Sequence, residues 1–166
     1  MVRPTARMLK QCENSECWDL ECKNQERENL EVIDLCNVNG TEKVELKMKF
    51  QVADVKKPLL AVCRVAEKGN KVVFGPEDED NYILNIRTGR KIPLLKNGRG
   101  SYLLEVWMSG EKTIITVDSG AEESVCPKEW GSKFPTKPCK AIKFRGAGGE
   151  EIKHYGERDV VVKTSF

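Results

Sequence analysis

The chain has 166 residues, of which 39% are hydrophobic and 33% are charged, enough for one soluble domain with a modest core. No stretch approaches the roughly 20 apolar residues that a membrane-spanning helix needs. The formal net charge of +2 is small and the charges are mixed along the chain, so we expect neither a nucleic-acid nor a membrane partner.

Two features of the sequence bear on the cellular compartment. Residues 1–10 carry basic side chains without an apolar run after them, which does not fit a secretory signal. The chain has seven cysteines, an odd number, and without a signal they indicate free thiols in a reducing compartment. We therefore expect an intracellular, cytoplasmic protein.

Residues 1–42 are expected to be a polar arm, because they are rich in Glu, Asn, Lys and Cys and poor in core-forming periodicity. Cys12, Cys17 and Cys22 recur every five residues. Zinc ligands are usually about two to four residues apart, and no histidine is near, so a solvated or helical segment is favoured over a metal site. Within the arm, residues 30–35 fit either a short strand or a helical turn.

A more regular pattern begins in the next segment, residues 43–75. Apolar residues alternate with polar ones over 44–52, which predicts a half-buried strand. Pro58 is suited to the start of a short apolar helix, and Gly69 is suited to its end. Another short strand is expected at 72–74.

Residues 76–110 predict a small antiparallel β meander. Its strands are expected at 82–86, 92–95 and 102–107, with turns rich in glycine and polar residues between them.

The last segment, residues 111–166, opens with the β-branched run 113–117. Further strands are expected at 140–144, 152–155 and 159–163, with a flexible Gly-rich turn at 146–149. Short strands dominate the whole chain, so the predicted fold class is mostly β with one short helix.

The β-branched run leads directly into Asp118-Ser119-Gly120-Ala121. An aspartic protease needs two carboxylates that face one water. Because two like charges about 3 Å apart cannot both ionise, the pair shares one proton. One carboxylate then acts as the base and the other as the acid. A small hydroxyl residue beside the aspartate can bond to a partner loop, and a glycine after it allows close backbone approach. Asp-Ser-Gly alone is also an ordinary turn in which the aspartate caps backbone amides.

Residues 114–121 resemble the active-site motif of retropepsins, the aspartic proteases of retroviruses and retrotransposons. The resemblance continues at 143–152, which is similar to the Gly-rich flap that opens for substrate and closes over it. It implies that Asp118 is the catalytic residue. It implies support of the active-site loop by Ser119, Gly120 and Ala121, and substrate binding by the flap residues Gly146, Ala147, Gly148 and Gly149.

The two halves of the family's lobe are in swapped order. Residues 50–69 resemble the part that follows the flap, in which a strand crosses near the active site and passes into one helix. Residues 82–107 resemble the segment before the integrase in copia-like retrotransposon polyproteins. The resemblance thus assigns 43–75 to the second half-lobe, 76–110 to an added β meander and 111–166 to the catalytic half-lobe.

Two explanations of the swapped order remain open. The chain is a circularly permuted, retropepsin-like closed β lobe, or it is a slice through tandem copies that completes its lobe with a second chain. A permuted lobe predicts that the strand through Phe50 lies beside the strand after the flap.

The resemblance implies an aspartic endopeptidase, a hydrolase of a retroelement polyprotein. With one Asp-Ser-Gly per chain, activity requires a homodimer that brings two copies of Asp118 together. The expected substrate is an extended peptide or polyprotein segment with apolar residues at the cut, and no cofactor or metal is required. The alternatives are a catalytically inactive, retroelement-derived interaction or dimerisation module and a remnant without function. The one histidine, His154, is expected at the surface, and Glu122 and Glu123 in a solvated loop.

Overall fold

A computed structural model describes residues 31–38 and 41–165, and the cysteines at 12, 17 and 22 lie outside them. Within the described residues the fold is mostly β with one short α-helix, as the sequence predicts. Residues 30–35 of the sequence fit either a strand or a helical turn, and the structure has a strand there, at Glu31–Val38.

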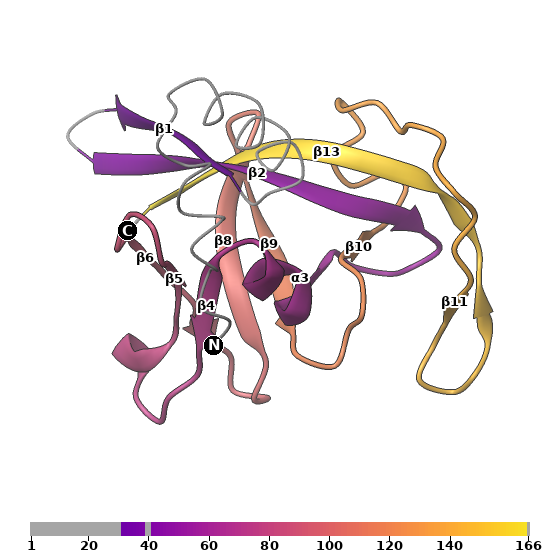
Figure 1. Ribbon diagram of the computed structural model, residues 1–166, viewed down its shortest axis with the longest axis horizontal. Helices are drawn as coiled ribbons and strands as arrows, with labels where there is room; N and C mark the ends of the chain where they lie inside the picture. Colours follow the sequence, from indigo (N-terminus) through magenta and orange to yellow (C-terminus); the bar gives the residue numbers. More distant parts are fainter. Residues whose placement is uncertain (1–30, 39–40, 166) are drawn as a thin grey trace, which may run out of the picture.

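Eight strands form one mixed sheet. The strand order is β1-β2-β10-β3-β9-β8-β13, and β7 pairs with β8. Because β13 also pairs with β2 along almost its whole length, the sheet nearly closes into a ring (Figure 1). The strands are β1 (Glu31–Val38), β2 (Thr41–Ala53), β3 (Leu59–Ala61), β7 (Leu95–Lys96), β8 (Tyr102–Met108), β9 (Glu111–Asp118), β10 (Val125–Cys126) and β13 (His154–Ser165).

Two small antiparallel sheets complete the described fold. One consists of β4 (Asn70–Val73), β5 (Tyr82–Asn85) and β6 (Lys91–Pro93), with a 3-10 turn, η2 (Asp78–Asp80), between β4 and β5. The other is a hairpin of β11 (Phe144–Arg145) and β12 (Glu151–Ile152). It projects at the end of the molecule where β2 ends and β13 begins (Figure 1).

The core lies inside the ring and follows the alternation predicted for residues 44–52. The inward side chains of β2 are at most 2% exposed: Val44, Leu46, Met48, Phe50 and Val52. Burial of each such side chain contributes roughly 1.5–3 kcal/mol. Leu104, Ile115 and Val160 face them from β8, β9 and β13.

The predicted helix is also present, but it begins at Val62 and not at Pro58, because Leu59–Ala61 pair with β9 as strand β3. α3 (Val62–Glu67) follows β3 without a break, and its one fully buried side chain is Val65. Gly69, at φ +78, follows the C-cap residue and ends the helix as expected.

Four strand predictions differ from the structure. The segment at 102–107 does not join the meander, because Leu104 and Val106 of β8 are buried in the core of the large sheet. At 140–144 only Phe144 is in a strand, because its partner strand β12 ends at Ile152, the residue opposite Phe144. The two expected strands at 152–155 and 159–163 are replaced by short β12 and one long β13.

Gly156 explains the continuity of β13. The strand has an irregularity between His154 and Gly156, where φ of the glycine is +134. A Cβ at this position would lie 2.4 Å from the carbonyl oxygen of Lys137. Glycine therefore permits the bulge and the close approach of the neighbouring chain.

Candidate active site

Asp118 is the last residue of β9, and the short strand β3 pairs with the last three residues of β9. β3 runs parallel to β9, with Leu59 opposite Thr116 and Ala61 opposite Asp118. Ile115 and Val117 of β9 are buried, which fixes the strand against the core. The half-buried Asp118 is therefore presented from a rigid strand end.

The turn after β9 orients the Asp118 carboxylate. The backbone N–H of Gly120 donates a hydrogen bond to Asp118 Oδ1 at 2.8 Å. Ser119 and Gly120 are exposed. The same hydrogen bond is made by an ordinary turn aspartate, so this contact fits both interpretations of the motif.

The loop that follows, residues 121–124, is fastened to β3 and α3. Ser124 Oγ accepts a hydrogen bond from the buried N–H of Ala61 at 3.0 Å. The Cys63 thiol donates to the carbonyl oxygen of Ala121 at 3.3 Å. Arg64 donates from Nε to the carbonyl oxygen of Glu122 at 3.0 Å. Through these contacts β3 and α3 hold the loop 121–124 that follows Asp118.

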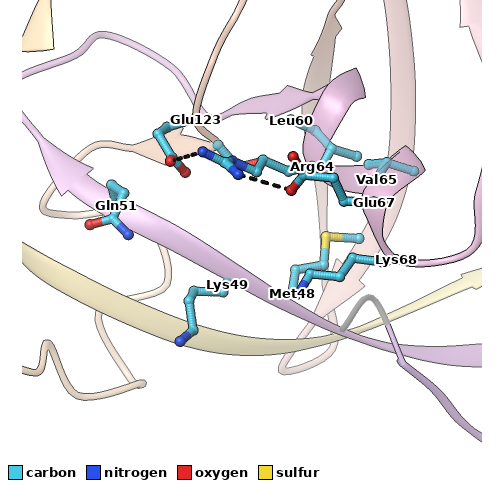
Figure 2. Close-up of a pocket in the computed structure, with 10 residues that line it drawn as sticks. Met48, Lys49, Gln51, Leu60, Arg64, Val65, Glu67, Lys68 and Glu123 are labelled. Atoms are coloured by element: carbon cyan, nitrogen blue, oxygen red, sulfur yellow. Dashed lines mark hydrogen bonds and ion pairs between the residues drawn. The ribbon is translucent and has the colours of Figure 1, made fainter. Parts of the chain in front are cut away.

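Arg64 also binds two carboxylates. Its guanidinium contacts Glu67 at 2.8 Å and forms a second ion pair with Glu123 (Figure 2). Its hydrogen bond to Glu67 and, to a smaller extent, its hydrogen bond to Glu123 raise the pKa of Arg64 above its ordinary value. Glu123 is therefore not the solvated residue that the sequence predicts. Sequence reasoning missed the roles of Arg64, Glu123 and Ser124, because only the folded chain brings them together.

A hollow of about 230 Å³ lies between β2 and α3, beside this ion pair (Figure 2). Met48, Leu60 and Val65 form its apolar part, and charged side chains surround it. Asp118 does not line it, so this hollow is separate from the candidate active site.

A larger groove of about 750 Å³ joins the Asp118 loop to the hairpin. Five of the eight residues predicted from the motif and the flap line this groove: Asp118, Gly120, Ala121, Gly146 and Ala147. The structure therefore brings together two segments that are far apart in the sequence.

The other three predicted residues lie elsewhere. Gly148 and Gly149, in the turn of the hairpin, do not line the groove. Ser119 lines a second hollow, of about 420 Å³, together with Asp118, Phe74 and Tyr102. Asp118 is thus at the boundary between the groove on the hairpin side and this second hollow.

The hairpin has the geometry of a tight glycine turn. Phe144 pairs with Ile152 in β11 and β12. The N–H of Gly146 donates to the carbonyl oxygen of Glu150 at 2.9 Å, and the φ of Gly149 is +86. A Cβ at Gly146 would lie 1.9 Å from the carboxylate of Glu150, so a larger residue at 146 would displace this side chain.

His154 anchors the base of the hairpin, which corrects its predicted surface position. The half-buried imidazole Nε2 lies 2.9 Å from Gln51 Oε1 and 3.0 Å from the carbonyl oxygen of Gly156. Its ring packs edge-on against Phe144 at 5.2 Å between centroids. The contacts of His154 with Phe144 and Gln51 join the base of the hairpin to β2.

Two further features of the described residues concern metal binding and membrane spanning. Among residues 31–38 and 41–165, no group of three or more His, Cys, Asp or Glu side chains is placed to hold a metal ion. In the same residues, no helix combines the length and apolar character needed to cross a membrane.

Comparison of the chain with protein-family models, with curated proteins and with solved structures finds no match. A functional assignment therefore depends on the residues and the geometry described above.

Proposed function

We propose that this protein is a retropepsin-like aspartic endopeptidase that acts as a homodimer on extended peptide segments of a retroelement polyprotein. The observation that carries the proposal is the groove shared by Asp118 and the glycine hairpin residues Gly146 and Ala147. A glycine hairpin that shares a groove with a catalytic aspartate can close over a bound peptide, and a second copy of the chain supplies the second aspartate that cleavage requires.

The pairing of β2 with β13 supports a permuted lobe. Phe50 lies opposite Arg158 within one chain, so the strand through Phe50 is beside the strand that follows the hairpin. β3 crosses beside Asp118 and passes into α3, as the resemblance implies for the second half-lobe. Both observations favour a circular permutation over a slice that depends on a second chain to complete its lobe.

The reaction needs two copies of Asp118. In the homodimer the two carboxyl groups share one proton and titrate as a pair. The ionised carboxylate takes a proton from water, whose oxygen attacks the peptide carbonyl carbon, while the protonated carboxyl donates to the carbonyl oxygen. Proton transfer to the amide nitrogen then lets the C–N bond break.

The remaining motif residues have supporting roles in this proposal. Gly120 orients Asp118 through its N–H, and the exposed Ser119 is available to bond to the partner copy. The hairpin closes over the peptide, whose backbone pairs as an added strand. Apolar groove residues, among them Val55, Leu59 and Ile152, receive the side chains beside the cut.

The test is cleavage of a mixed peptide library between pH 4 and 7 by the purified protein. Asp118→Asn should abolish cleavage, whereas Asp78→Asn, a matched change in the exposed turn η2, should not. Activity should rise more steeply than linearly with protein concentration and stop with a transition-state inhibitor of aspartic proteases. Absence of cleavage by a folded and demonstrably dimeric protein would reject the enzyme and favour the interaction module.

A further inference from the structure

The charged side chains around the groove are unevenly distributed. Lys143 and Arg145 of the hairpin segment line the groove, and both are exposed. Glu150 and Glu151 belong to the same hairpin but do not line it. The hairpin therefore presents a basic edge to the groove.

Within the described residues no carboxylate neutralises this edge. The ion pairs include none with Lys143 or Arg145. The carboxylates that line the groove, Asp118, Glu122 and Glu123, all belong to the end of β9 and the loop after it, and Glu123 is paired with Arg64. The positive charge of the hairpin edge is thus available to a ligand in the groove.

Between the two walls the groove is apolar. Its lining there comes from three separate parts of the chain: Val55 and Leu59, Val125, and Phe144 and Ile152. A ligand that fits the whole groove combines apolar side chains with a negative charge on the hairpin side.

We propose that this groove selects peptides in which an Asp or Glu side chain accompanies the apolar residues at the cut and binds Lys143 and Arg145. The inference deepens the proposed function, and its cleavage arm rests on that function. Recognition itself requires only the groove, so binding can be measured without catalysis.

The probes are fluorescent peptides with one apolar pair at the centre. Glu, Gln or Lys is placed in turn at each of the three positions on either side of that pair. Binding is measured by fluorescence anisotropy with the full-length Asp118→Asn protein, and cleavage with the unmodified protein. Two exposed ion pairs are worth about 2- to 30-fold in affinity, so the best Glu peptide should bind more tightly than its Gln counterpart by this factor. Salt should reduce the difference.

Charge reversal at Lys143 and Arg145 tests whether these two residues bind the acidic side chain of the peptide. The double variant Lys143→Glu and Arg145→Glu should prefer Lys peptides over Glu peptides. A matched double variant, Lys133→Glu and Lys140→Glu, changes the net charge equally at exposed positions that do not line the groove. It should keep the preference for Glu.

The outcomes separate the two proposals. Equal binding of Glu, Gln and Lys peptides, or an unchanged preference after reversal at 143 and 145, overturns the charge selection. Cleavage that depends on Asp118 but shows no charge preference also overturns the charge selection, and it supports the proposed endopeptidase activity. Charge-selective binding without any cleavage supports the proposed peptide recognition and rejects the proposed endopeptidase activity. If the protein shows no peptide binding and no cleavage, both proposals are rejected.

Discussion

Ala61 lies directly opposite Asp118 in the parallel pairing of β3 with β9. Ala61 is fully buried, and its N–H donates to the Ser124 hydroxyl on the far side of the loop that contains Asp118. One short strand thus contacts this loop at its beginning and at its end. The strand β3 and the N–H of Gly120 therefore both help to position the Asp118 carboxylate.

Ser124→Ala should destabilise the protein. The substitution leaves the buried N–H of Ala61 without its acceptor, which costs about 1–3 kcal/mol. The exposed Ser132→Ala is the matched control and should change the free energy of unfolding very little. Urea unfolding measures both, and equal stability of the two variants would contradict the importance of this contact.

Gly156→Ala should also be destabilising, for a backbone reason. The new Cβ would lie 2.4 Å from the carbonyl oxygen of Lys137, and φ at this residue is +134. We expect a loss of about 1–3 kcal/mol and a melting temperature lower by roughly 2–4 °C for each kcal/mol. Gly98→Ala, which meets no atom within 4 Å, is the control. A melting temperature as high as that of the control would argue against the bulge in β13.

Cys126 should make stability fall with pH in the alkaline range. Burial raises the pKa of its thiol from 9.0 to about 11, and the charge of Arg158 only partly offsets this. Between these values the unfolded chain loses the proton while the folded chain keeps it, so the free energy of unfolding decreases as pH rises.

The check for Cys126 is urea unfolding from pH 8 to 10.5, with Cys126→Ala alongside. The unmodified protein should lose about 2 kcal/mol more than the variant over the range. Parallel pH profiles would contradict the prediction. In the native protein at pH 8, iodoacetamide should modify the exposed Cys63 and leave Cys126 unreacted.

Amide hydrogen exchange should divide the chain into a slow and a fast part. β2 and β13 are paired along almost their whole length, and their inward side chains are buried, so their amides should exchange slowly. The hairpin 144–152 has a two-residue ladder and exposed glycines and should exchange quickly. Strong protection of the hairpin without a bound peptide would contradict its role as a mobile flap.

Local sequence patterns predicted some elements well. The alternation over 44–52 gives the core face of β2, and the apolar run that ends at Gly69 gives α3. The strand before Asp118 is present because five β-branched residues in succession favour extended backbone. In each case the signal lies within a few residues of the element it predicts.

Other features depend on partners that are distant in sequence. The segment 102–107 has the local character of a meander strand, yet burial of Leu104 and Val106 places it in the large sheet. The ion pair of Arg64 with Glu123 joins residues separated by 59 positions, and no local pattern marks it. The position of His154 against Gln51 is similar, with 103 residues between them. These contacts follow from tertiary packing, which one sequence does not reveal.

The pairing of β2 with β13 also has a consequence for biosynthesis. β13 is the last of the described strands to leave the ribosome, whereas β2 emerges near the beginning. Until β13 arrives, the edge of β2 that it will cover is open, and contacts that span so much of the chain form slowly. The nascent protein should therefore depend on chaperones that shield β2, and premature termination before β13 should yield aggregates instead of a smaller stable fold.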